Sequence, residues 1–161
     1  MVRSMFNGAF TEILLVGLAA LLLVAAVIDV RTFTISNRLN LTVALLAPLY
    51  WLSIALPLWP GVGIQLAAGA GVFALLAAAF YAGMMGGGDV KLAAALALWF
   101  SPASTIKFLV VTSLAGGVLT LGIVAFHRFK RREGRPEIPY GVAIAIGGLA
   151  ILTQRFLNQF A

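Results

Sequence analysis

The chain has 161 residues, of which 62% are hydrophobic and 10% are charged, and its formal net charge is +6. Soluble domains contain about 45–50% apolar residues, so this composition excludes an ordinary soluble domain and indicates an integral membrane protein. The chain has no cysteine and one histidine, which excludes disulfides and thiolate nucleophiles and argues against a histidine-based metal site or a Ser-His triad.

Five apolar stretches approach the roughly 20 residues with which a helix crosses a bilayer. In chain order they cover residues 11–28, 39–56, 62–82, 105–126 and 138–157. A sixth stretch, residues 92–100, is apolar but short, and proline and glycine residues mark the connections. The sequence therefore predicts an all-α, polytopic membrane protein with about six transmembrane helices, forming a single membrane-embedded domain over residues 1–161.

The basic residues favour a crossing by the short stretch 92–100. If it crosses, one side of the membrane holds only Arg3, Lys107 and Arg155, and the other holds Arg31, Arg38, Lys91, Arg128, Lys130, Arg131, Arg132 and Arg135. The positive-inside rule places the second side in the cytoplasm and both termini outside. Three tryptophans agree with this count because they lie toward the outer face, as an interfacial belt requires: Trp51, Trp59 and Trp99.

Two of the five acidic residues, Asp29 and Asp89, lie where an apolar helix meets the cytoplasmic side. An ionisable group near the bilayer core costs up to about 2.5–3.5 kcal/mol, so it usually marks a function. Two predicted spans separate these residues, so both reach the same membrane face whichever way the protein is inserted. Two neighbouring carboxyl groups share a proton and supply one acid and one base, which is the chemistry of an aspartic protease.

Three consecutive glycines, Gly86 to Gly88, precede Asp89. Glycine tolerates positive φ and has no side chain, so this segment could bend and approach an extended peptide. The alternative is a glycine-rich span end that packs closely against its neighbours, with Asp89 paired to Lys91 or Arg31.

Three segments resemble the signatures of the prepilin peptidases, a family of GxGD intramembrane aspartyl proteases. GGGDVK, residues 86–91, resembles the G-x-G-D-x-K motif. IDVRTFTISNRLN, residues 28–40, resembles an aspartate at a span end followed by Ile-Pro-Asn, with Ser36 in place of the proline. EIPYGVAIAIGG, residues 137–148, is similar to the closing Pro-Tyr-Gly helix. The chain is most similar to the short, peptidase-only, CpaA/TadV-like type of tight-adherence (Flp) pilus systems.

The resemblance implies an aspartic endopeptidase of the bacterial inner membrane, multi-pass, with its active site facing the cytoplasm. Its substrates would be Flp-type prepilins and pseudopilins, cut just before their hydrophobic N-terminal helix, and it would need no cofactor and no metal. Asp29 and Asp89 would be the catalytic pair, with the assignment of base and acid left open. The cytoplasmic N-terminal domain that longer relatives link to methylation of the new amino terminus has no counterpart in this sequence.

Four other residues would support the pair by resemblance. Gly86 and Gly88 would shape the loop that admits the substrate backbone, and Lys91 could hold Asp89 in place or simply be a lysine of the positive-inside pattern. Asn37 would orient the loop after Asp29 through side-chain hydrogen bonds to the backbone. Tyr140 and Gly141 are weaker candidates, because Pro-Tyr-Gly also suits the plain start of a helix.

Two functions from other classes stay open. An ion-coupled transporter could bind a proton or cation at Asp29 and Asp89, although no internal repeat is evident and both acids lie at span ends. A noncatalytic membrane subunit of a pilus or secretion assembly could use the alanine-rich spans as packing faces. The basic cluster of residues 128–135 is interpreted as a determinant of topology and of contact with anionic lipid, and not as a nucleic-acid site. The sequence leaves the oligomeric state open.

Overall fold

The computed structural model describes residues 2–130, 134 and 136–158, with only the backbone for residues 2–7. These residues form six α-helices and no β-strand, so the predicted all-α class is confirmed. The helices are α1 (Val2–Thr32), α2 (Asn37–Ser53), α3 (Gly63–Tyr81), α4 (Gly87–Ala97), α5 (Pro102–Phe129) and α6 (Tyr140–Leu157). A short π-helical turn, η1 (Leu58–Val62), precedes α3.

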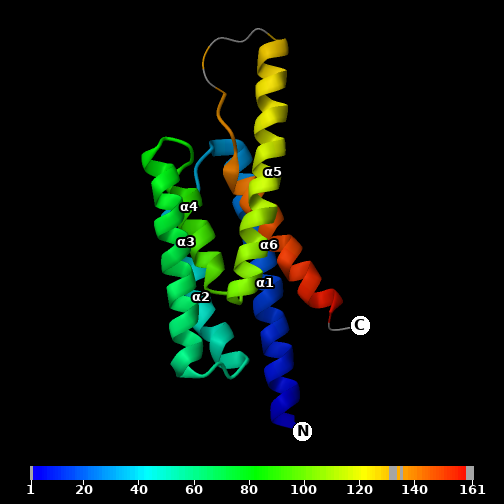
Figure 1. Ribbon diagram of the computed structural model, residues 1–161. Helices are drawn as coiled ribbons and strands as arrows, with labels where there is room; N and C mark the ends of the chain where they lie inside the picture. The colour runs from blue at the N-terminus through cyan, green and yellow to red at the C-terminus, as the bar shows by residue number, and fades with distance from the viewer. Residues whose placement is uncertain (1, 131–133, 135, 159–161) are drawn as a thin grey trace.

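The helices form a bundle in which α4 contacts α2, α3 and α6. α1 packs against α2 and α6, and α5 packs along α6 and extends past the other helices at its C-terminal end (Figure 1). The beginning of α1 and the end of α6 lie toward one end of the bundle, whereas the end of α1 and the beginning of α6 lie toward the other (Figure 1). This arrangement brings the predicted span ends that carry Asp29 and Asp89 to the same end.

Among the described residues, four helical segments are long and apolar enough to cross a membrane: Gly8–Thr32, Leu58–Tyr81, Pro102–Phe129 and Tyr140–Leu157. The helix α2 has 17 residues and α4 has 11. At 1.5 Å per residue, α4 is about 16 Å long, roughly half the thickness of a 30 Å hydrocarbon core. The predicted count of six spans is therefore not confirmed, and the orientation of the termini stays a prediction. Several residues counted for that orientation lie outside the described side chains: Arg3, Arg131, Arg132 and Arg135.

The short helix α4 is held inside the bundle by its apolar side chains and by two indole rings. Leu92, Leu96 and Ala97 have no exposed surface. Nε1 of Trp51 donates to the Leu98 carbonyl at 2.8 Å, and Nε1 of Trp99 donates to the Val43 carbonyl at 3.0 Å. These bonds tie the end of α4 to α2.

The predicted tryptophan belt is wrong for two of its three members. Trp51 and Trp99 are 8% and 2% exposed, because each indole satisfies a backbone carbonyl within the bundle. Trp59 is 83% exposed, as a belt residue would be. Burial of a polar indole N–H requires a partner, and the carbonyls near the end of α4 and within α2 supply one for each ring.

The connection between α1 and α2 is a tight loop, residues 33–36. Phe33 has a left-handed φ of 51°, an uncommon conformation for a bulky side chain, and it turns the chain directly after α1. Ser36 begins α2 by accepting a hydrogen bond from the Leu39 N–H at 3.3 Å. Its φ of −69° is close to the roughly −65° that proline imposes, so this serine adopts the backbone conformation of the proline it replaces in the motif.

Candidate active site

Asp29 lies in the last turn of α1 and is 2% exposed. The beginning of α6 covers it, and the backbone N–H groups of Gly141 and Val142 lie within electrostatic reach of its carboxyl group. A Cβ atom on Gly141 would be 2.8 Å from Oδ2 of Asp29. Within the described part of the chain, Oδ2 has no hydrogen-bond partner. The closing helix α6 therefore surrounds Asp29 closely while leaving one of its oxygen atoms unbonded.

Asp89 lies in the first turn of α4 and is 7% exposed. Its Oδ2 accepts a hydrogen bond from the Gly86 N–H at 3.2 Å, an interaction that closes the N-terminal turn of the helix. The two carboxyl groups lie close enough for the charge on Asp29 to act on Asp89. The structure thus places the two acids that the sequence singled out within electrostatic range of each other, from helices that are far apart in the chain.

Ile35, in the loop between α1 and α2, contacts both the segment that carries Asp89 and the segment of α6 that covers Asp29. A Cβ atom on Gly88 would be 2.6 Å from the Ile35 carbonyl oxygen, and one on Gly141 would be 2.6 Å from Cδ1 of Ile35. Neither position has room for a side chain. The three segments quoted from the sequence therefore converge around one buried side chain, which is 6% exposed.

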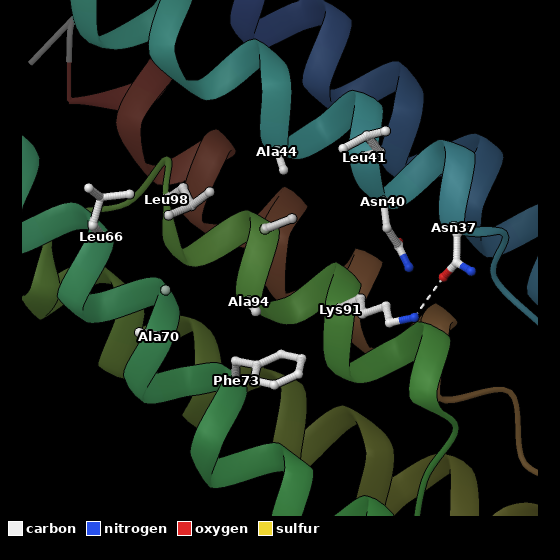
Figure 2. A pocket seen from close by; sticks show the side chains of 12 residues that line it. Asn37, Asn40, Leu41, Ala44, Leu66, Ala70, Phe73, Lys91, Ala94 and Leu98 are labelled. Carbon is white, nitrogen blue, oxygen red and sulfur yellow. Dashed lines mark hydrogen bonds between the residues drawn. The ribbon is translucent and has the colours of Figure 1, made fainter.

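Two asparagines of α2 connect that helix to the beginning of α4. Nδ2 of Asn40 donates to the Gly88 carbonyl at 2.9 Å, and Nζ of Lys91 donates to Oδ1 of Asn37 at 2.8 Å (Figure 2). The expected hydrogen bond from the Asn37 side chain to the loop backbone is not formed, because its Oδ1 binds Lys91 and Ser36 caps the helix. Lys91 makes no ion pair with Asp89, because its ammonium group is turned toward α2.

The glycines before Asp89 serve close packing and not an unusual backbone conformation. Gly86 has a φ of −75°. In the connection between α3 and α4, the residue with a positive φ is Gly83, at 70°. A Cβ atom on Gly86 would be 2.9 Å from Oδ2 of Asp89. Gly88 packs against Ile35 of this same chain, so the close approach expected for a substrate backbone is made here by the loop between α1 and α2.

An apolar groove of about 550 Å³ runs between α2, α3 and α4 beside this site. Figure 2 shows its walls, which are formed by Leu41, Ala44, Leu66, Ala70, Phe73, Ala94 and Leu98. Asn37, Asn40 and Lys91 lie at one end of the groove, where α4 begins. We call it the α2–α3–α4 groove. Asp29 and Asp89 do not line it, and both are buried.

A sequence model described as the type IV leader peptidase family matches residues 16–121. The chain belongs to the type IV leader peptidase family. Two curated proteins named prepilin leader peptidase/N-methyltransferase, from Burkholderia pseudomallei strains 1026b and K96243, are each 29% identical over 170 residues. The alignment covers 92% of this chain and 48% of each relative, so the chain spans about half the length of the curated relatives it matches. No solved structure matches the chain.

The match to the leader peptidase family contains both acids and the whole α2–α3–α4 groove, but it ends within α5. The helix α6, which covers Asp29, lies beyond the matched residues. In this member of the leader peptidase family, Gly141 and Val142 of α6 complete the surroundings of Asp29. The sequence had indicated Gly141 only as a weaker candidate.

Three residues of the site were missed or undervalued from the sequence. Asn40 closes the quoted segment 28–40 but carried no role, and Ile35 looked like an ordinary loop hydrophobe. Gly141 was named only as a weaker candidate, because Pro-Tyr-Gly also suits the plain start of a helix. The available signal was the combination of a glycine at the second position of an apolar helix and an asparagine inside an apolar span, since both are unfavourable without a specific contact.

Proposed function

We propose that the chain is an intramembrane aspartyl endopeptidase that removes leader peptides from type IV prepilins and pseudopilins of the Flp kind. The proposal rests on two buried acids from separate helices, Asp29 and Asp89, which lie near enough for the charge of one to act on the other, within a chain of this family. The curated relatives bear the name prepilin leader peptidase, which supports the substrate class.

The pair would act as one acid and one base. The basic carboxylate removes a proton from water, and the resulting oxygen nucleophile attacks the scissile carbonyl carbon. The other carboxyl group protonates the carbonyl oxygen, and a proton passes to the leaving amide nitrogen as the C–N bond breaks. Asp29, with Oδ2 unbonded, has an oxygen atom available for this chemistry. The step uses no group beyond these two carboxyls, water and the peptide.

The α2–α3–α4 groove suits the apolar helix that follows a prepilin leader. Its walls are almost entirely apolar, and its polar end lies at Lys91, half a helical turn from Asp89 on α4. A helix resting in the groove would therefore place its N-terminal junction beside the first turn of α4. The scissile bond would reach the acids only when the loop between α1 and α2, or the glycine connection, moves aside, because both acids are buried.

We propose further that the protein is a multi-pass protein of the bacterial inner membrane with this site toward the cytoplasm. Arg31 lies in the last turn of α1, as Asp29 does, and Arg38 and Lys91 lie near the beginnings of α2 and α4. These basic residues support this orientation through the positive-inside rule.

Coexpression of the chain with a tagged Flp-type prepilin tests the catalytic proposal. Wild-type protein is expected to remove the leader, and Asp29→Asn and Asp89→Asn to reduce the rate by at least about 1,000-fold, since the acid-base pair acts as a unit. Glu12→Gln is the matched control, because it makes the same acid-to-amide change at an exposed position of α1 and should cleave normally. Product is followed by mass, which also reports whether these 161 residues methylate the new amino group; we propose that they do not.

Two results would contradict the proposal. Cleavage by both aspartate variants at equal membrane abundance would show that the carboxyl pair is not catalytic. Failure of the wild type to cut any Flp-type prepilin or pseudopilin, with retained assembly of the pilus, would favour a noncatalytic subunit.

A further inference from the structure

A second cavity, of about 580 Å³, lies at the end of the bundle opposite the two acids. It exists because α4 ends at Ala97, so the space beyond the short helix is lined by neighbouring helices and is not filled. The connection between α4 and α5, around Trp99 and Phe100, forms one wall, and the last turns of α6 form another. We call it the distal cavity. Nothing in the proposed cleavage reaction uses it.

The distal cavity is lined by cations and hydrogen-bond donors. Lys107 of α5 and Arg155 of α6 both line it, together with the hydroxyl groups of Tyr50 and Ser104. The Arg155 guanidinium donates to the Tyr50 hydroxyl and lies over the Tyr50 ring, with its Cζ 5.2 Å from the ring centroid. Neither cation forms an ion pair with any acid among the described residues, and Glu12, the described acid at this end, is exposed on α1. Among the described residues, no acid therefore compensates this positive charge.

A buried side chain in the same cavity lacks a partner. Gln65 of α3 is 7% exposed, and its Oε1 has no hydrogen bond in the described part of the chain. A buried amide without a partner is unfavourable, above all at membrane depth, so its persistence indicates that a polar group belongs beside it. Because the amide carries both a donor and an acceptor, it can bind a ligand that presents a hydroxylated anionic group.

An apolar groove continues from the distal cavity along the outside of the bundle. It has a volume of about 300 Å³ and lies between α5 and α6, lined by Ile106, Val110, Val111 and Ala150. Lys107, Ile151 and Gln154 line both this α5–α6 groove and the distal cavity. The cationic distal cavity and the apolar α5–α6 groove therefore adjoin each other along these three shared residues.

We propose that the distal cavity binds the phosphate headgroup of an anionic glycerophospholipid, with one acyl chain lying in the α5–α6 groove. A phospholipid headgroup and free phosphate would both be recognised through a phosphate oxygen bound by Lys107 and Arg155, since both side chains pair well with phosphate. The attached groove favours a phospholipid over free phosphate, because inorganic phosphate leaves an apolar channel unused. The glycerol hydroxyls of a phosphatidylglycerol headgroup would also reach the Gln65 amide. This proposal concerns binding alone and does not rest on the proposed peptidase activity.

Native mass spectrometry of the full chain in detergent, titrated with phosphatidylglycerol, phosphatidylcholine and inorganic phosphate, tests the assignment. Phosphatidylglycerol is expected to bind most tightly, and Lys107→Gln to weaken that binding by about tenfold, as the loss of one charge-assisted hydrogen bond implies. Lys130→Gln is the matched control, since it removes the same charge from the opposite end of α5 and should leave binding unchanged. Gln65→Leu should weaken phosphatidylglycerol binding without altering the charge.

A variant that fills the channel separates the two sources of phosphate. Ala150→Trp places a large side chain in the α5–α6 groove and should weaken phosphatidylglycerol binding several-fold while leaving inorganic phosphate unaffected. Equal binding of phosphatidylglycerol and phosphatidylcholine, or equal effects of Lys107→Gln and Lys130→Gln, would overturn the proposal. Tight binding of inorganic phosphate, with no effect of Ala150→Trp on either ligand, would assign the site to free phosphate instead.

Discussion

Gly141 packs directly against the carboxyl group of Asp29. A Cβ atom at this position would be 2.8 Å from Oδ2 of Asp29 and 2.6 Å from Cδ1 of Ile35. Neither neighbour can retreat easily, because both are buried at 2% and 6% exposure. A methyl group on residue 141 must therefore displace the carboxyl group or separate α6 from α1.

We expect Gly141→Ala to lower the rate of leader removal by about 100-fold, because a displacement near 1 Å at a reacting group costs about that factor. Gly117→Ala in α5 is the control, since a Cβ atom there would meet nothing within 4 Å. The measurement is the initial rate of leader removal at equal membrane abundance. A Gly141→Ala protein that cleaves at the wild-type rate would mean that Asp29 tolerates the displacement.

The two acids were predictable from the sequence, whereas Gly141 was not. Asp29 and Asp89 stand out because charged residues are rare in this chain and costly at a span end. Residue 141 must be glycine because α6 packs against α1 and leaves no space for a side chain there. A contact between distant parts of the chain leaves no local pattern, so only the structure identifies it.

At the scale of elements, α2 and α4 are connected by polar bonds at both ends of their contact. The Asn40 amide holds the Gly88 carbonyl at the start of α4, and the indoles of Trp51 and Trp99 hold its end. A helix of 11 residues has few turns with which to stabilise itself, so its ends need partners from neighbouring helices.

We expect Asn40→Asp to destabilise the protein by about 1–3 kcal/mol, because an ionised aspartate has no donor for the Gly88 carbonyl and places a second acceptor beside it. Thr42→Ala is a control on the same helix, since Thr42 is exposed and bonds only within α2. Thermal unfolding in detergent gives the comparison. Equal midpoints for the two variants would show that the bond to Gly88 carries little stability.

The existence of the six helices was predictable from the sequence. The short length of α4 and its burial inside the bundle were not. Apolar run length located all six helices, because the apolar content needed for the bilayer is visible locally. Whether 92–100 crosses was inferred from the distribution of charge, which constrains topology but not helix length. The tryptophans misled for a similar reason, since an indole at a span end suits both an interface and a buried carbonyl.

At the scale of the whole molecule, the site and the distal cavity occupy opposite ends of one bundle. The beginning of α1 and the end of α6 both lie toward the cavity end (Figure 1), in agreement with termini on a common face. The absence of cysteine from the sequence makes that face accessible to measurement by single added cysteines.

Labelling of intact spheroplasts with a membrane-impermeant maleimide should distinguish the two ends. Ala103→Cys, exposed at the start of α5, is expected to react directly, and Met84→Cys, exposed in the connection before α4, only after permeabilisation. The positive-inside pattern gives this direction. Labelling in the reverse order would invert the proposed topology, and labelling of both from one side would place the two connections on the same face.

Ile35 packs against both the segment that carries Asp89 and the segment that covers Asp29. Its backbone carbonyl rests against Gly88 and its side chain against Gly141, so one residue contacts both segments that carry or cover an acid. A displacement of the loop of residues 33–36 would therefore disturb the packing against Gly88, beside Asp89, and against Gly141, beside Asp29, at the same time.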